Sequence, residues 1–155
     1  MSDETVGSGR IVLGITGGIA AYKTAELVRL LTRRGHDVVP IMTPWATRFI
    51  GPLTLEALTG HPVRVETPGN EAEAGIEHIA LIRAADLFLI APLTANTLAK
   101  MVHGLADNFL TTAYLAHRGK TMVCPAMNTG MLDHPATRRN LEQLAADGAV
   151  IVAGE

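Results

Sequence analysis

Charged residues, cysteine, aromatic residues and long apolar runs are all scarce in this chain of 155 residues. Charged residues make up 18% of it, against about 25% in an average soluble domain. A chain with so little charge usually covers part of its surface with copies of itself. Thirteen Lys and Arg stand against fifteen Asp and Glu, so the chain has none of the basic excess of a nucleic-acid-binding protein.

The single cysteine, Cys124, rules out an internal disulfide and fits a reducing cytosol. No apolar run approaches the roughly 20 residues that a membrane span needs. Residues 1–9 are polar and lack the apolar core of a signal peptide. We therefore expect a disordered leader over 1–9, a single domain over 10–155, and a cytoplasmic oligomer without nucleic-acid or membrane partners.

Strand-like and helix-like segments alternate along the chain. The expected strands are 10–16, 37–42, 86–91, 121–124 and 149–153. The expected helices are 17–35, 43–50, 52–58, 78–85, 94–102, 107–117 and 135–147. Nearly continuous apolar strands are typical of a parallel sheet covered on both faces. The pattern predicts a doubly wound α/β fold, and the polar stretch Glu66–Gly75 predicts a mobile loop.

The segment that follows the apolar residues 87–90 carries three polar side chains that can bind a ligand. Pro92 predicts that a helix opens here, with free backbone N–H groups above the sheet edge. Thr94, Asn96 and Thr97 cluster around this start, and helix capping alone needs only one such residue. We predict a cradle for an anion or a cofactor.

A second turn of this kind, Gly17-Gly18-Ile19-Ala20, follows the first strand. It lacks the G-x-G-x-x-G spacing, and the second strand leads into Thr43 instead of the acidic residue that binds a ribose in dinucleotide sites. The Thr43 hydroxyl suits a phosphate or a flavin ring edge. The two turns predict a nucleotide or flavin site and disfavour NAD, unless Gly17-Gly18 only forms a tight turn.

Two further residues are candidates for chemistry. Asn128, in the turn Pro-Ala-Met-Asn after the fourth strand, is placed either to bind a substrate carboxylate or to cap the next segment. His78 adjoins the predicted loop and a strand-end site, whereas the other five histidines fall in turns and near helix ends. We interpret Cys124 as a small buried strand residue.

Taken together, these segments resemble the flavin-dependent cysteine decarboxylases. The matching pieces are Gly-Gly-Ile-Ala-Ala-Tyr-Lys at 17–23, His-Ile-Ala-Leu at 78–81 with Ala-Asp at 85–86, Ile-Ala-Pro-Leu-Thr-Ala-Asn-Thr at 90–97, Gly-Leu-Ala-Asp-Asn-Phe-Leu-Thr at 104–111, Pro-Ala-Met-Asn at 125–128 with Met131, and Pro-Ala-Thr at 135–137 with Asn140. Each motif alone is weak, but they occur in family order over nearly the whole chain.

The resemblance implies a Rossmann-like or flavodoxin-like sheet with helices on both faces. It also implies a homotrimer or a dodecamer, with FMN between subunits. The implied cofactor-binding residues are Gly17, Gly18, Ile19, Ala20, Thr43, Thr94, Asn96, Thr97, Ala126 and Met127. His78 corresponds to the essential histidine of the family, and Asn128, together with Met131, belongs to the substrate site.

The chemistry implied is oxidative decarboxylation of a cysteine carboxylate. Oxidation of the thiol by flavin gives a thioaldehyde, whose C=S group accepts the electrons as CO2 leaves. His78 suits proton removal. The expected substrate is 4′-phosphopantothenoylcysteine, converted to 4′-phosphopantetheine in coenzyme A biosynthesis. The alternatives are a C-terminal cysteine of a peptide and, in another class, a non-catalytic FMN-binding regulatory subunit.

Two departures from the family pattern bear on the substrate. Leu132 stands where the family usually has Trp, and we expect the substrate clamp of the family to be absent from this chain. Cys124 is at the wrong place to be the clamp cysteine that helps to reduce the enethiol in the coenzyme A enzymes. The reductive half-reaction is therefore left open.

Overall fold

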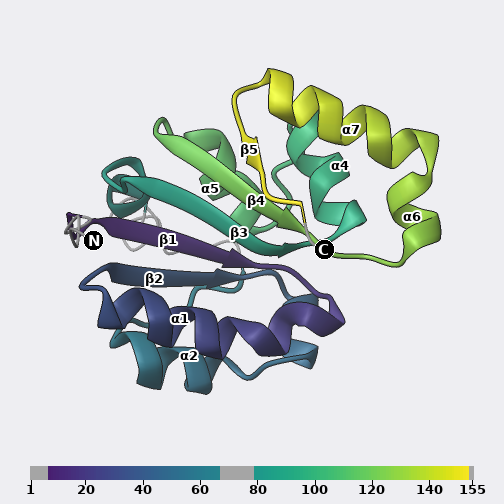
Figure 1. The fold of residues 1–155 in the computed structure, drawn as a ribbon. Helices are drawn as coiled ribbons and strands as arrows, with labels where there is room; N and C mark the ends of the chain where they lie inside the picture. The colour runs from purple at the N-terminus through teal and green to yellow at the C-terminus, as the bar shows by residue number, and fades with distance from the viewer. Residues whose placement is uncertain (1–6, 67–78, 154–155) are drawn as a thin grey trace, which may run out of the picture.

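The computed structural model describes residues 7–66 and 79–153 (Figure 1). His78, residues 1–6 of the expected leader and all of the predicted loop Glu66–Gly75 except Glu66 lie outside these ranges. Among the residues described, no helix combines the length and apolar content needed to cross a bilayer.

Five parallel strands form the sheet, in the spatial order β2-β1-β3-β4-β5. The strands are β1 (Arg10–Ile15), β2 (Asp37–Met42), β3 (Leu87–Leu93), β4 (Lys120–Pro125) and β5 (Val150–Ile151). This is the flavodoxin-like order of a doubly wound sheet, as predicted. The order reverses between β1 and β3, and ligands of such folds bind at the carboxyl ends of the strands beside this reversal.

Helices connect the strands and cover both faces of the sheet (Figure 1). They are η1 (Ile19–Lys23), α1 (Thr24–Arg33), η2 (Trp45–Arg48), α2 (Pro52–Thr59), α4 (Ala95–His103), α5 (Phe109–Ala116), α6 (Thr129–Asp133) and α7 (Pro135–Ala146). Residues 79–83 are also helical. Here η marks a 3-10 helix.

Two hydrophobic cores lie on opposite faces of the sheet. In β1, Leu13 belongs to the core that packs on α1 and α2, whereas Val12 belongs to the core under α4, α5 and α7. Neighbouring strand residues point to opposite faces, so both faces of the strand are buried. This explains why the strands appear in the sequence as continuous apolar runs.

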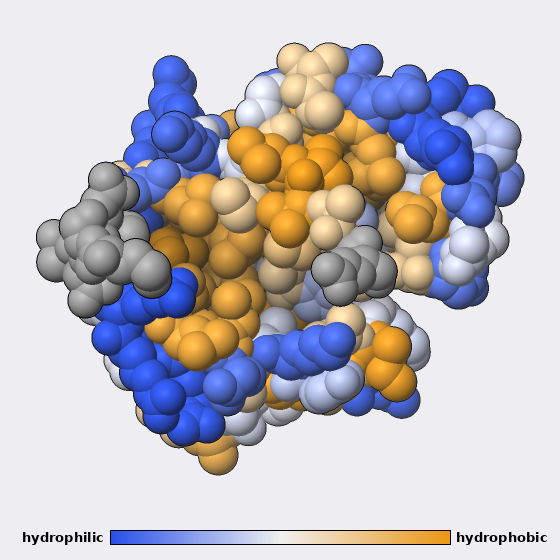
Figure 2. Space-filling view, viewed as in Figure 1, coloured by the Kyte–Doolittle hydropathy of each residue, from blue (hydrophilic) through white to orange (hydrophobic). Residues whose placement is uncertain are grey.

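The face that α1 and α2 cover remains partly open over β4 and β5. Met122 and Cys124 are only half-buried there, and Val150, paired in register with Met122, is 51% exposed. Figure 2 shows hydrophobic side chains gathered on this side of the molecule. Cys124 is therefore only partly buried, and the prediction of a buried residue was wrong to that extent. Its partial burial still raises the pKa of the thiol.

Pro92 does not open a helix as predicted, because it lies inside β3. The β3–β4 pairing shifts in register between Ile90 and Leu93, so the missing N–H of Pro92 falls where the ladder is already interrupted. The helix begins later, at Ala95. The expected helix over 17–35 divides into η1 and α1, and the short helix α6 was not predicted.

Candidate functional site

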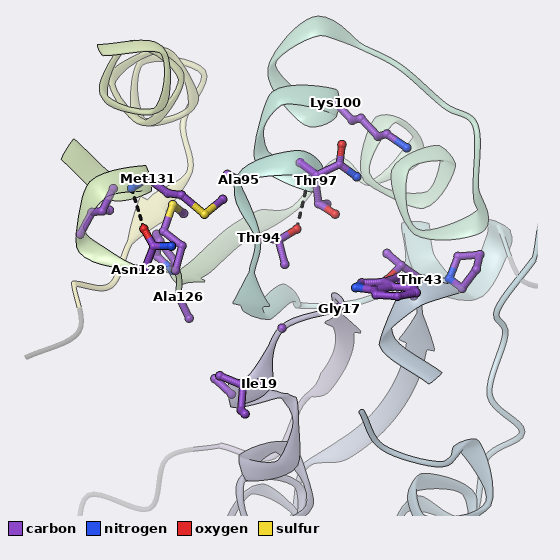
Figure 3. A pocket seen from close by; sticks show the side chains of 18 of the residues that line it. Gly17, Ile19, Thr43, Thr94, Ala95, Thr97, Lys100, Ala126, Asn128 and Met131 are labelled. Carbon is purple, nitrogen blue, oxygen red and sulfur yellow. Dashed lines mark hydrogen bonds between the residues drawn. The ribbon is translucent and has the colours of Figure 1, made fainter. Parts of the chain in front are cut away.

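A cavity of about 1220 Å³ lies at the carboxyl ends of the strands (Figure 3). The turns that follow β1, β2, β3 and β4 all contribute to its wall. It is lined by Gly17, Gly18, Ile19, Ala20, Lys23, Thr43, Pro44, Trp45, Thr94, Ala95, Asn96, Thr97, Lys100, Asp107, Asn108, Pro125, Ala126, Met127, Asn128, Met131 and Leu132. Every site residue predicted from the sequence and described by the structure is in this set.

The hydroxyl of Thr16 joins the turns after β1 and β3. It donates a hydrogen bond to the carbonyl of Pro92 and accepts one from the N–H of Thr94 at 3.0 Å. Thr16 is fully buried. The one hydroxyl of Thr16 thus acts both as a donor and as an acceptor toward the segment before α4. These two bonds fix the position of the turn at Gly17 relative to the start of α4.

The first turn of α4 presents backbone donors to the cavity. The side chain of Thr94 caps the helix by accepting from the N–H of Thr97 at 3.2 Å, and the carbonyl of Thr94 accepts from Leu98. The N–H groups of Ala95 and Asn96 precede the first intrahelical bonds, so they remain available to an anion. Thr94 thus serves as a helix cap and as part of the cavity wall.

Thr43 also combines a local role with a place in the wall. It is buried, and its hydroxyl accepts from the N–H of Ala46 at 3.3 Å at the start of η2. Its own N–H donates to the carbonyl of Ile15 at 3.0 Å. This last bond holds the end of β2 against the end of β1, next to the turn Gly17-Gly18.

Asn128 caps α6, which was the local role considered for it. Its Oδ1 accepts from the N–H of Met131 at 2.9 Å. In the part of the chain that the structure describes, no partner is seen for the amide nitrogen, so both of its N–H donors remain for an acceptor such as a carboxylate. The apolar side chains of Met127 and Met131 adjoin it in the cavity wall.

Several charged and polar residues of the wall were not predicted as site residues. Lys100 forms an ion pair with Asp107 at 2.7 Å, and Asn108 caps α5 by accepting from the N–H of Thr111 at 2.9 Å. Asp107 and Asn108 belong to the segment 104–111 that matches the family, which was a signal for both. Lys100 lies in the last turn of α4, and no motif identified in the sequence marks it as a site residue. Lys23 adds a second cation. Across 7–66 and 79–153, no group of three or more His, Cys, Asp or Glu could hold a metal ion.

The cavity has two chemically different parts. Thr94 and Thr97 lie in the middle with Lys100 beyond them, while Ala126 and Met131 supply apolar surface on one side (Figure 3). Such a combination fits a ligand with an anionic end and a flat apolar end. The individual roles of these residues remain predictions, and His78 lies outside the described residues.

Comparisons of the sequence agree with this geometry. Residues 2–154 match the family described as Flavoprotein. The coenzyme A biosynthesis bifunctional protein CoaBC of Escherichia coli is 47% identical over 142 residues, which are 92% of this chain and 35% of that protein. CoaBC of Vibrio vulnificus is 44% identical over 155 residues, or 98% of this chain and 39% of that protein. The chain thus spans well under half of the curated relatives it matches.

Solved structures show the same similarity. The FMN-dependent cysteine decarboxylase SpaF superposes with a TM-score of 0.83 at 37% identity, covering 94% of this chain and 83% of that one. A PPC decarboxylase variant complexed with pantothenoylaminoethenethiol gives 0.81 at 32% identity, covering 94% and 82%. Fold, cavity and sequence match together place this chain in the Flavoprotein family.

Proposed function

We propose that the chain is an FMN-dependent decarboxylase that acts on a cysteine carboxylate, with 4′-phosphopantothenoylcysteine as its substrate and 4′-phosphopantetheine as the product. The observation that carries this proposal is the gathering of separate turns, after four strands, around one large cavity that is lined by the start of α4 and by apolar side chains of the turn after β4. Relatives with about 45% identity are coenzyme A biosynthesis proteins.

The residues present fit FMN. The first turn of α4 and Lys100 suit its phosphate, and the apolar side chains of Ala126 and Met127 suit its ring system. At about 1220 Å³, the cavity exceeds the roughly 300–1,000 Å³ of typical ligand pockets. It therefore has room for a substrate beside the cofactor.

When bound, FMN supplies the two-electron oxidation of the substrate thiol that makes loss of CO2 possible. The protein supplies orientation and proton transfer. The free N–H donors of Asn128 bind the substrate carboxylate, and the bond from Met131 to its Oδ1 fixes which way they point. His78 is the base that removes a proton during thiol oxidation.

A direct assay separates the proposed substrate from its rival. The FMN-loaded protein is incubated with 4′-phosphopantothenoylcysteine or with a peptide that ends in cysteine, and the products are weighed by mass spectrometry. Loss of CO2 alone indicates that reduced flavin returns its electrons, whereas loss of CO2 and two hydrogens indicates an enethiol product. If neither substrate changes, the decarboxylase proposal fails and a flavin-binding regulatory role replaces it.

A peptide that ends in cysteine remains the second candidate. The description of SpaF, which is 37% identical to this chain, names a cysteine decarboxylase without a coenzyme A intermediate, while the PPC decarboxylase variant is 32% identical. Both substrates end in a cysteine whose nitrogen is joined in an amide bond, and they differ in the group beyond that amide. Competition between them for one protein therefore measures which is preferred.

Replacement of His78 tests the catalytic assignment. We expect His78→Asn to retain flavin absorbance but to lose at least about 100-fold in turnover, since a positioned general base contributes roughly 10²–10⁴-fold. Asn removes the titrating group but keeps a polar side chain. Stopped assays with equal flavin occupancy check this result. Unchanged turnover would remove His78 from the mechanism.

We also propose that the chain assembles as a homotrimer, with dodecamers as the larger form. The low charge content, the half-open sheet face at Met122 and Val150, and the exposed side chains of Ile19 and Met131 at the cavity support self-association. Light scattering after size exclusion measures the mass. A monomer at micromolar concentration, with or without FMN, would contradict the assembly but not flavin binding.

A further inference from the structure

The indole of Trp45 lies against the backbone of Gly17. A Cβ atom on Gly17 would overlap Trp45 Cδ1 and would lie 2.7 Å from Cγ and 2.8 Å from Cβ of the same side chain. Gly17 does not have a positive φ, so its backbone conformation does not require glycine. It is the contact with Trp45 that requires glycine here, because a Cβ atom would overlap the indole side chain. At Gly18, by contrast, the nearest neighbour of an added Cβ is Thr94 Cγ2 at 3.7 Å, an ordinary contact.

Two neighbours hold the ring of Trp45 in this place. The guanidinium carbon of Arg48 lies 5.3 Å from the ring centroid, a cation–π arrangement. Phe49 meets the ring edge-on, with centroids 6.1 Å apart and an interplanar angle of 77°. Trp45 nevertheless stays 59% exposed and lines the cavity. The held ring therefore presents an apolar wall to whatever occupies the cavity.

Trp45 stands at one end of the cavity. The strand ends follow the order β2, β1, β3, β4, so Trp45 after β2 and Asn128 after β4 lie on opposite sides of the middle turns. Figure 3 shows the same arrangement, with Thr43 on one side, Thr94 and Thr97 in the middle, and Ala126 and Asn128 on the other. With the flavin ring near Ala126 and the phosphate in the middle, any extension of the phosphate would run toward Trp45.

FAD is FMN whose phosphate carries an adenylate. In dinucleotide-binding sheets the ribose of the adenosine half is bound at the end of the second strand. Pro44 and Trp45 follow the second strand of this chain. We infer that Trp45 is a specificity-determining residue that limits the cavity to the mononucleotide FMN by occupying the space that the adenylate of FAD would need. This inference rests on the proposed FMN site.

Binding measurements on the purified protein test the inference without any turnover. FMN and FAD are titrated by calorimetry into the wild type, Trp45→Ala and a matched control, Tyr22→Ala, which removes another exposed aromatic ring that does not line the cavity. We expect the wild type and the control to prefer FMN strongly. In Trp45→Ala the preference for FMN over FAD should fall by about tenfold or more, with FMN affinity within about threefold of the wild type.

Three outcomes overturn the inference. If Trp45→Ala binds FMN with an unchanged preference over FAD, Trp45 does not determine the specificity, and the proposed FMN site stands. If the wild type binds FAD as tightly as FMN, there is no specificity for Trp45 to determine, and the FMN site again stands. A wild type that binds neither flavin refutes the FMN site itself, so failure of the inference and failure of the proposed function are distinguishable.

A second experiment does not depend on the Trp45→Ala protein binding flavin well. Trp45 is the single tryptophan, so its emission reports on its own surroundings. Gly17→Ala should displace the ring, shift its emission and weaken the preference for FMN. In the Trp45→Ala background the same Gly17→Ala change should cost little stability. Unshifted emission in Gly17→Ala would show that the ring does not rest on Gly17 and would overturn the inference.

Discussion

A single buried hydroxyl connects two loops that are distant in the sequence. Thr16 and Pro92 are 76 residues apart, yet their hydrogen bond and the bond from the Thr94 N–H to Thr16 Oγ1 make one unit of the turns after β1 and β3. Without this hydroxyl, a buried carbonyl and a backbone N–H would both lose a partner. Burial makes such a loss expensive.

Replacing Thr16 by Val tests this connection at the scale of one residue. The change keeps the shape but removes both hydrogen bonds, and we expect the free energy of unfolding to fall by about 1–3 kcal/mol. FMN affinity should also fall, because the Thr94 N–H loses its partner and only the long bond from the Thr16 N–H to the Pro92 carbonyl, at 3.4 Å, then joins the two turns. Urea unfolding and FMN titration measure the two effects. Thr16→Ser, which keeps the hydroxyl, should restore most of both; equal loss in Val and Ser would assign the effect to packing.

At the scale of the element, three helices begin in the same way around the cavity. Thr94, Asn108 and Asn128 each accept a hydrogen bond from the N–H three residues later, at the starts of α4, α5 and α6. Each of the three also lines the cavity. For these residues the role of helix cap and a place in the cavity wall are therefore compatible: the cap bond holds the side chain while the residue lines the cavity.

The start of α5 is the strongest of these caps and the easiest to test. Asn108 and Thr111 form a reciprocal capping box, in which the Asn108 N–H also donates to Thr111 Oγ1 at 3.3 Å. We expect Asn108→Ala to cost about 1 kcal/mol and to lower the melting temperature by roughly 2–4 °C. Calorimetry measures this shift. Asn108→Asp keeps a capping oxygen and should recover most of it, and failure to recover would locate the effect in lost packing.

At the scale of the whole molecule, the two edges formed by the strand ends differ in chemistry. The cavity lies at the carboxyl ends of the strands, and an ionic cluster lies at the amino ends of β1 and β2. There Asp37 binds Arg10 Nε at 3.0 Å and His61 Nε2 at 2.6 Å, which ties the starts of β1 and β2 to the segment after α2. The pKa of Asp37 is lowered, and the hydrogen bond with His61 is the largest cause.

Acid stability should depend on this cluster. Because the folded pKa of Asp37 lies below its ordinary value of 3.8, the carboxylate stabilises the fold above that pH and stops doing so as the pH falls through the folded pKa. Asp37→Asn should be less stable than the wild type at pH 7 and equal to it in stronger acid. The side chain is 42% exposed, so solvent screening limits the difference to about 1 kcal/mol or less.

Urea unfolding of both proteins across the acid range measures this dependence. Asp133, which pairs with Arg138 on the surface, provides a matched control. Its replacement by Asn should change stability little at neutral pH. A constant difference between the wild type and Asp37→Asn down to the lowest pH would contradict the assignment to the ionised carboxylate.

The sequence predicted β2 to the residue and most other elements to within a few residues, because buried parallel strands and glycine helix ends leave strong local signals. It failed at Pro92, whose place in β3 depends on an interruption of the ladder with β4. It also missed α6, which is too short to show helical periodicity. Both failures concern features that no local pattern carries.

The sequence by itself determined the class of fold, the family and the turns that surround the cavity, since these follow from local patterns of apolar, glycine and capping residues. Only the tertiary structure decided which side chains meet: Thr16 joining two turns, Lys100 paired with Asp107, and Trp45 resting on Gly17. Such contacts join residues from separate elements. They arise when the sheet brings the strand ends to one edge, and spacing along the chain does not encode them.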